Sequence, residues 1–386
     1  MLTLAVLSRL FLIIVIVEFS LEYLIIFTGE IEEFPEKRIN APITNTKIIE
    51  PHTTYFFSIH FHNKITYKSF HFLKEIRSFY YNKIYKYCNH FSFMYKKYLI
   101  IASKKDKAGI NITTALSQFR KNPFLGAIQR GPLAERDAGI VKNSPNVPIF
   151  DFYLVEGETI FDESLDKERI NRYDFVIFAS KHESEKGGKT LSVHAPGNWR
   201  TAQMGGVSGK ICRASALFQK QLFINLNKKT KEHLLKDYQV TLECTHHGPF
   251  IDKPCVYIEI GATDTEWSDR RAAFVVAQTI KDTINEFKTN PYNEIAIGIG
   301  GPHYCPNFNE LQLKSNYAFA HMIPEYSLPI SLEMIQEAID KTEEELDLVI
   351  FDWKGLKNKD ERERIIKLLD KNYIRYKRTS EAKKEY

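Results

Sequence analysis

The stretch that decides the fold runs from residue 239 to residue 249 and reads Gln-Val-Thr-Leu-Glu-Cys-Thr-His-His-Gly-Pro. It begins as a short run typical of a buried strand and ends in two adjacent histidines before a Gly-Pro turn. In α/β proteins, side chains that bind or react stand at the ends of strands. The stretch therefore predicts a strand of a sheet and, at its end, a candidate site containing His246 and His247. Because successive residues of an extended chain point to opposite faces, we expect one of these two histidines to face a cleft while the other packs behind it.

Three further histidines stand in equivalent places along the chain. His182 follows the apolar run 175–179, His194 ends the short run 190–194, and His303 follows the run 295–299. Glycine or proline residues flank His194 and His303, and such residues fix sharp turns close to a ligand. Because strand ends from distant parts of a chain converge, we expect these histidines to form one cleft.

The rest of the organised chain alternates apolar runs with amphipathic helical patterns. This alternation predicts an α/β fold, three-layer α/β/α, with a mixed, largely parallel sheet. The clearest helical stripe lies within 269–287. Strands are expected at 98–103, 149–155, 175–179, 190–194, 239–243, 256–260, 295–299 and 346–351. Helices are expected at 112–119, 214–235, 269–287, 331–342 and 360–370.

Composition restricts the class of protein without choosing a partner. The 386 residues include 44% hydrophobic and 26% charged residues, as in an ordinary globular protein. A formal charge of +5 tolerates a polyanionic partner but does not require one. The five cysteines form no CxxC pair, which argues against a disulfide framework or a zinc-finger module and favours a cytoplasmic location. No dinucleotide-binding or P-loop glycine motif is present.

The N-terminal segment 1–93 differs in composition from the rest of the chain. It contains one glycine, Gly29, and is crowded with aromatic residues, isoleucine, lysine and asparagine. We expect it to lie outside the functional fold, as upstream sequence before a start at Met94, so that residues 94–386 form the catalytic domain. The alternative is a membrane anchor formed by residues 2–27, in which Glu18 and Glu22 would be costly.

Among the acidic residues, Glu259 stands out because it interrupts an apolar strand just before Gly261. A carboxylate there can orient a histidine, bind a metal or act as a general base. Acidic residues at 264, 266 and 269 are better explained as caps of the following helix. Cys244 and Cys305 are interpreted as buried structural residues.

The motifs, in this order, resemble the archaeal and plant-type D-aminoacyl-tRNA deacylase family, the zinc-associated class. The resemblance runs from about Met94 to the C-terminus and rests on several motifs, which lie at 181–184, 192–194, 245–249, 259–269, 300–304 and 320–321. It implies a phosphorylase/hydrolase-like α/β fold similar to that of peptidyl-tRNA hydrolases. It also implies hydrolysis of D-aminoacyl-tRNA, with free D-amino acid and tRNA as products, and dependence on Zn²⁺.

Residue roles follow from our own interpretation of the sequence. The candidate catalytic residues are His246, His247, Glu259 and His303, and the candidate metal ligands are His194, His246, His247 and His303. The candidate substrate-binding residues are His182, Lys314 and His321. The irregular spacing of the histidines fixes neither a ligand set nor the number of ions, and a metal-free site with histidine as general base stays open.

The expected partner is a D-aminoacyl-tRNA, bound by a monomer that needs no stable protein partner and, over residues 94–386, no membrane. Basic residues near the C-terminus are candidates for contact with the tRNA backbone, namely Lys371, Arg375, Lys377 and Arg378. Two other enzymes remain as alternatives: a metallohydrolase of the aminopeptidase or amidase type, and a peptidyl-tRNA hydrolase-like enzyme. A non-catalytic RNA-binding protein is a third possibility, although the chain lacks an RNA-recognition aromatic signature.

Overall fold

The computed structural model describes residues 95–121, 149–184, 187–290, 292–356 and 358–386. It also gives two short antiparallel strands, β1 (Ile14–Val15) and β2 (Ile25–Ile26). The chain divides into two units, 1–75 and 76–386. Apart from the two short strands, the expectations for segments 1–93 and 2–27 fall outside the described residues. Within the described residues, no helix has the length and apolar character needed to cross a membrane.

The first sheet has six strands in the order β4-β3-β5-β8-β6-β7. The first four of these strands are parallel, β6 is antiparallel to β8, and β7 is parallel to β6. The central strand β8 pairs residue for residue with β5, so that Ser180 lies opposite Glu259. The strands are β3 (Lys97–Ser103), β4 (Ile149–Val155), β5 (Phe175–Glu183), β6 (Thr190–His194), β7 (Gln239–Leu242) and β8 (Cys255–Ala262).

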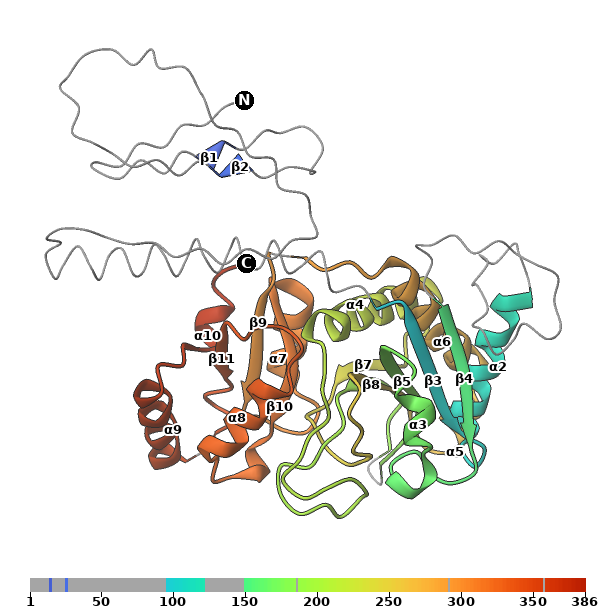
Figure 1. Cartoon of the computed structure of the whole chain (residues 1–386), viewed down its shortest axis with the longest axis horizontal. Helices are drawn as coiled ribbons and strands as arrows, with labels where there is room; N and C mark the ends of the chain where they lie inside the picture. The colour runs from blue at the N-terminus through green and yellow to red at the C-terminus, as the bar shows by residue number, and fades with distance from the viewer. Residues whose placement is uncertain are drawn as a thin grey trace, which may run out of the picture. The chain divides into compact units, whose positions relative to one another are not determined.

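The second sheet has four parallel strands in the order β10-β9-β11-β12. They are β9 (Glu294–Ile299), β10 (Tyr317–Ile323), β11 (Leu348–Phe351) and β12 (Tyr376–Arg378). Figure 1 shows this sheet in orange and red, with α8 (Leu332–Asp340) and α9 (Lys359–Lys371) beside it. Because all four strands run in one direction, their carboxyl ends share one edge.

The long helices begin at residues that can satisfy free backbone N–H groups. Ser215 accepts from the backbone N of Phe218 at 3.0 Å before α4 (Ala216–Glu232), and Asp269 accepts from that of Arg271 at 2.8 Å before α6 (Arg270–Glu286). The other helices are α2 (Lys107–Lys121), α3 (Lys167–Ile170), α5 (Asp264–Trp267), α7 (Pro306–Lys314) and α10 (Thr379–Ala382).

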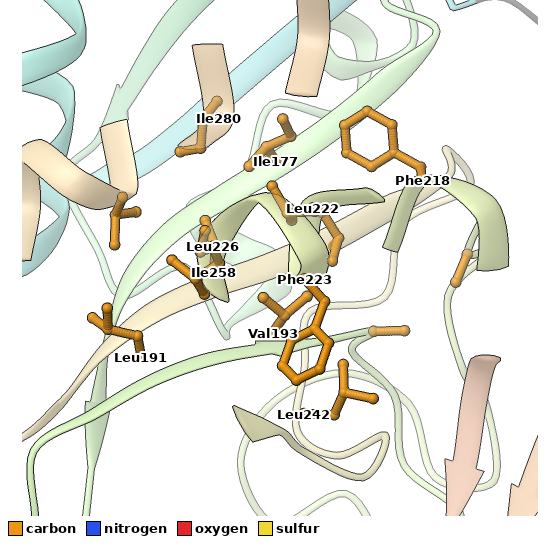
Figure 2. Packing of buried hydrophobic residues seen from close by; sticks show 14 of the residues in the cluster. Ile177, Leu191, Val193, Phe218, Leu222, Phe223, Leu226, Leu242, Ile258 and Ile280 are labelled. Atoms are coloured by element: carbon orange, nitrogen blue, oxygen red, sulfur yellow. The ribbon is translucent and has the colours of Figure 1, made fainter. Parts of the chain in front are cut away.

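The main core lies where α4 and α6 cover the first sheet. Figure 2 shows side chains of α4, among them Leu222 and Phe223, packed with Ile177, Val193 and Ile258 of the strands. These side chains have no exposed surface. Truncating one of the buried leucines to alanine typically costs about 2–5 kcal/mol. The core therefore holds β5, β6 and β8 at fixed positions, and two candidate histidines stand at the ends of these strands, His182 in β5 and His194 in β6.

The predicted α/β class with a mixed, largely parallel sheet is confirmed, and the strands are divided between two sheets. The strands at 149–155 and 190–194 have the expected bounds. Within described residues 95–386, two strands and four helices were not anticipated, namely β10, β12, α3, α5, α7 and α10. In the segment that forms β10, the sequence singled out only His321, as a candidate substrate-binding residue.

Candidate active site: a buried cluster of histidines and glutamates

The candidate site forms where the end of β7 meets the second sheet. Beyond β7, the backbone N of Cys244 donates to the carbonyl of His303 at 2.9 Å, and that of Thr245 donates to Met322 at 3.1 Å. These bonds join the first sheet to the ends of β9 and β10. As a result, residues 243–248 and residue 303 are held side by side although they are far apart in sequence.

Glu243 lies at the centre of the cluster and has no exposed surface. Its carboxylate oxygens lie 3.3 Å from the Nδ1 of His182, 3.2 Å from the Nε2 of His303 and 3.6 Å from the Nε2 of His246. None of these approaches has hydrogen-bond geometry, so within the described residues both oxygens are buried without a donor. Buried carboxylate oxygens in this state are suited to hold a proton, a water molecule or a cation.

Glu259 approaches the same histidines from β8. Its carboxylate lies 3.5 Å from the Nε2 of His194, 3.6 Å from the Nδ1 of His182 and 3.9 Å from the Nε2 of His247. Burial opposes ionisation, but the neighbouring histidines, His182 foremost, outweigh it and hold the pKa of Glu259 well below its usual range. The same balance, with His303 as the leading histidine, lowers the pKa of Glu243. Both carboxylates are therefore ionised at neutral pH.

His246 and His247 both belong to the cluster, which corrects the expectation that only one would face it. Their ring centroids lie 4.3 Å apart, and each ring also lies within 5 Å of the ring of His194. The alternation argument fails because the backbone is not extended here. His247 has a left-handed φ of 44°, which turns its side chain back toward that of His246.

Three of the histidines share one pattern of hydrogen bonding. The Nδ1 of His246 lies 2.8 Å from the carbonyl of Cys244, that of His247 lies 2.6 Å from its neighbour's carbonyl, and that of His194 lies 3.2 Å from Ala195 O. A carbonyl can only accept, so each Nδ1 carries a proton, and in the neutral form of each ring the lone pair is then on Nε2. One ligand atom from each histidine lies within 4.8 Å of the others. This is the arrangement that zinc-binding histidines commonly adopt.

The five histidines differ in charge. Burial would lower the pKa of His182 and His303, but Glu259 beside His182, and Cys244 with Glu243 beside His303, raise these pKa values to about 10 and about 11. Burial lowers the pKa of His247 to about 4 and that of His246 well below its usual range. The cluster thus combines protonated and neutral imidazoles at neutral pH.

Two tyrosines hold the protonated histidines from outside. The hydroxyl of Tyr304 lies 3.0 Å from the Nε2 of His182. The hydroxyl of Tyr326 lies 3.2 Å from the Nδ1 of His303 and 2.9 Å from the thiol of Cys244. Tyr326 is 59% exposed, so its ring stands at the rim of the cluster while its hydroxyl reaches inside.

Two of the predicted substrate-binding residues lie outside the cluster. His321 is fully buried, with its Nδ1 3.2 Å from the hydroxyl of Thr245 and its Nε2 3.2 Å from a carbonyl, and burial lowers its pKa to about 4. Lys314 is an exposed residue at the end of α7, where it pairs with Glu310 at 3.2 Å. These positions fit a structural role for His321 and a surface ion pair for Lys314. His182, in contrast, lies within the cluster.

Two cluster residues received no functional role from the sequence. Glu243 was placed inside the predicted strand 239–243, and Cys244 was interpreted as a buried structural residue. The signal that identified Glu259, a carboxylate at the end of an apolar strand, is equally present at Glu243. Cys244 is indeed buried, but its thiol also lies 3.4 Å from the Nδ1 of His303.

Three overlapping sets of side chains among the described residues could hold a metal ion. They are His194 with His246 and His247, Cys244 with His246 and His303, and His182 with Glu243 and Glu259. Nitrogen and sulfur donors are typical of zinc, whereas the third set, with two carboxylates, is less selective. The donors present therefore fit a zinc ion.

Comparisons with known proteins agree with this site. A family model described as D-aminoacyl-tRNA deacylase matches residues 170–377, a range that contains every histidine and glutamate of the cluster. A D-aminoacyl-tRNA deacylase of Pyrococcus abyssi is 30% identical over 265 residues, covering 67% of this chain and 92% of the relative. One of Methanocaldococcus jannaschii is 30% identical over 290 residues, covering 73% and 99%. The crystal structure of a conserved protein of unknown function, AF0625, matches with a TM-score of 0.63 at 27% identity, covering 76% of this chain and 98% of that one.

Proposed function

The chain belongs to the D-aminoacyl-tRNA deacylase family, and on that premise we propose that it hydrolyses the ester between a D-amino acid and the terminal ribose of its tRNA. The products are a free D-amino acid and a tRNA that can be charged again. One observation carries the proposal beyond family membership: five histidines and two ionised glutamates converge from two sheets within the matched residues. Such a cluster is suited to acid–base and metal-assisted hydrolysis.

We further infer that His194, His246 and His247 hold a zinc ion. The inference is supported by the Nδ1–carbonyl contacts, which leave the Nε2 atom of each ring as the one that can bind a metal, and by the closeness of the three donors. Three protein ligands with one open position are typical of catalytic zinc sites. A zinc ion held there would supply Lewis acidity toward water and the ester carbonyl.

The two glutamates and His303 have separate tasks in this proposal. Glu259, ionised beside the proposed ligands, takes the proton from the attacking water at its carboxylate. His303 is 29% exposed, so its positive charge faces incoming substrate and stabilises negative charge that develops on the ester. Glu243 has no exposed surface and acts through His303, whose imidazole it keeps protonated.

The test is hydrolysis of D-tyrosyl-tRNA and L-tyrosyl-tRNA by the full chain, with metal content measured on the same sample. We expect hydrolysis of the D-ester in preference to the L-ester, and loss of activity when His194, His246 or His247 is replaced by alanine. His233→Ala is the matched control, because that histidine is exposed and bonds only to Gln278 on the helical side of the sheet.

Separate outcomes would overturn separate parts of the proposal. Absence of hydrolysis, or equal rates on both stereoisomers, would contradict the deacylase function. Full activity after rigorous chelation would contradict the role of zinc and leave a metal-free site with histidine as base. Hydrolysis of amino-acid amides or peptides without tRNA would favour the amidase-type alternative.

A further inference from the structure

The edge of the second sheet continues outward from His303 as one packed rim. The backbone N of Glu325, after β10, donates to the carbonyl of Gly301 at 3.0 Å. Gly301 also lies against the loop after β11, since a Cβ built on Gly301 would stand 2.8 Å from the carboxylate of Asp352. The loops that follow β9, β10 and β11 are therefore fixed to one another, and a ligand of His303 must pass over them.

This rim carries a cluster of cations, which we call the tryptophan rim and define as Trp353, Lys354, Arg362 and Arg378. The guanidinium carbon of Arg378 lies 3.9 Å from the centre of the Trp353 ring, and that of Arg362 lies 5.1 Å from it. Lys354 is exposed in the same turn as Trp353. Stacking on an aromatic ring holds a guanidinium in place. The Nε of Arg362 also donates to the carbonyl of Leu356, so only its other N–H groups can bind an anion.

The charges of the tryptophan rim are not neutralised. In the described part of the chain, no carboxylate lies within 4.0 Å of the side-chain nitrogens of Lys354, Arg362 or Arg378. The acidic residues close in sequence are engaged elsewhere. Asp352 accepts from Asn307 and Gly355, and Glu381 accepts from the backbone N of Arg378. Of the two glutamates that flank Arg362, Glu361 accepts from Arg364 and Glu363 pairs with Lys359 at 3.7 Å. Many other surface cations do have such partners, as Lys189 has in Asp237 and Lys210 in Glu337.

Tyr326 adds an aromatic surface beside the histidine cluster, on the loop after β10 that Glu325 joins to Gly301. Its ring is largely exposed, whereas its hydroxyl is anchored on His303 and Cys244. An exposed ring fixed at one end is a suitable platform for a nucleic-acid base. The carboxyl-end edge of the second sheet thus carries a stacking surface after β10, His303 after β9, and cations after β11 and at β12.

We propose that this edge binds the single-stranded acceptor end of tRNA, with its terminal base on Tyr326 and the preceding phosphates on the tryptophan rim. The assignment rests on the proposed deacylase function, which places the ester at the histidines. The ester is joined to the last nucleoside, so the adjoining base and phosphates must lie close to the cluster. An exposed aromatic ring and unpaired cations on the same sheet edge as His303 are the groups that a base and phosphates bind.

The test compares two substrates of the full chain, D-tyrosyl-tRNA and D-tyrosyl-adenosine, which lacks every phosphate. For Lys354→Glu combined with Arg378→Glu, we expect the ratio of the two KM values to rise about tenfold or more. The Kd for uncharged tRNA should rise to a similar extent. Its dependence on salt should weaken by ~0.7 in the logarithmic slope for each lost phosphate contact.

A matched control reverses two exposed lysines elsewhere, Lys231 and Lys236, which precede β7 at the opposite end of that strand from Glu243. This variant has the same change in net charge and should keep both KM values and the Kd within about twofold of those of the wild type. If it weakens tRNA binding as strongly as the rim variant, general charge explains the effect and the proposal is wrong.

Tyr326 is tested by two substitutions that separate its ring from its hydroxyl. Tyr326→Ala should raise KM for both substrates, since each contains the terminal adenosine, whereas Tyr326→Phe, which keeps the ring, should raise KM less than Tyr326→Ala does. Equal KM values in all three proteins would overturn the role of the ring.

The outcomes distinguish this proposal from the proposed function. If the wild type binds tRNA through the tryptophan rim but hydrolyses neither ester, the deacylase function fails while the surface stands. If the rim variants lose activity equally on both substrates, the rim supports the cluster and does not bind tRNA. If the double variant unfolds, the Kd for uncharged tRNA is measured instead on two single variants that disturb the fold less, Lys354→Glu and Arg378→Gln. An unchanged Kd in both would contradict the proposal.

Discussion

The carboxylate of Glu243 lies 3.2 Å from the Nε2 of His303, and this contact joins the first sheet to the second inside the candidate active site. Glu243 follows β7 and His303 follows β9. The relationship has two consequences: a buried carboxylate gains a cationic neighbour, and an accessible imidazole keeps its proton at neutral pH. A change at either residue should alter the charge of the other.

Glu243→Gln should remove that charge while preserving the shape of the side chain. The pKa values of His303 and His182 should fall, because the carboxylate that raises both is gone. We expect kcat for D-tyrosyl-tRNA to fall about 100-fold or more with little change in KM, since Glu243 has no exposed surface. Single-turnover kinetics would measure the change.

Glu310→Gln is the control for this substitution, because Glu310 is a carboxylate in surface ion pairs with Lys314 and Lys383. Its kcat should equal that of the wild type. If Glu243→Gln retains wild-type kcat at unchanged metal content, the charge on His303 has no part in the reaction.

Proton release on metal binding should identify the ligand set. The pKa of His303 is about 11 and that of His247 is about 4. Of these two residues, therefore, His303 must lose a proton near pH 7.5 to become a ligand, whereas His247 need not. Zinc binding by His194, His246 and His247 should therefore release few protons, and binding by the set with Cys244 and His303 should release about one or more. Calorimetry of zinc binding to metal-free protein in buffers of different ionisation enthalpy would count them. Release of one proton or more would contradict the proposed ligands.

Local sequence patterns predicted the strands and helices whose ends coincide with a clear change of residue type in the sequence. The strand 149–155 is an apolar run interrupted only by Asp151, and its observed bounds are the predicted ones. The strand β10 was missed because its aromatic and alanine residues do not alternate clearly with polar ones. Its position beside β9 is determined by packing and by parallel pairing with a strand about twenty residues earlier.

Within the site, too, local patterns identified some residues, whereas contacts between distant segments determined the roles of others. His182, His194 and His303 were identifiable because each stands at or just beyond the end of a recognisable strand. The role of Glu243 could not be predicted, because it depends on the bond between the backbone N of Cys244 and the carbonyl of His303. The joint inward orientation of His246 and His247 could not be predicted either, because it requires the left-handed φ at His247.

Lys220 should make stability depend on pH. Its ammonium is buried and donates to the carbonyls of Gln312, Ser315 and Tyr317 at 2.6, 2.9 and 2.8 Å, which ties α4 to the end of α7 and the start of β10. Lys220→Met leaves three carbonyls without this donor and should lower the free energy of unfolding by about 2–4 kcal/mol near pH 7. Lys228→Met, on the exposed face of α4, is the control and should change it little.

The sign of the pH effect follows from the direction of the pKa shift. Burial lowers the pKa of Lys220 from 10.5 to about 8, so between these values the unfolded chain holds a proton that the folded chain has lost. The contribution of Lys220 to stability should therefore rise with pH from about 8, by at most roughly 3 kcal/mol. Denaturant unfolding of wild type and Lys220→Met at several pH values would measure the difference. A difference that stays constant would show that the three carbonyls keep Lys220 protonated.

Removal of residues 1–93 should leave the catalytic domain folded and active, because Tyr95, the first described residue of this unit, is already packed in its core. The Tyr95 ring lies 4.7 Å from that of Phe175 and 6.0 Å from that of Phe287, measured between centroids, and it is 8% exposed. A chain of residues 94–386 should keep kcat/KM within about twofold of the full chain's value, whereas Tyr95→Ala in either chain should lower the free energy of unfolding by about 3 kcal/mol. Tyr95→Phe is the informative control, since the hydroxyl is buried without a hydrogen-bond partner in the described residues and its loss should be neutral or stabilising. Thermal unfolding of the full chain, of residues 94–386 and of the Tyr95 variants would test the domain boundary. If the shortened chain is unfolded while Tyr95→Ala is stable, the domain begins before residue 94.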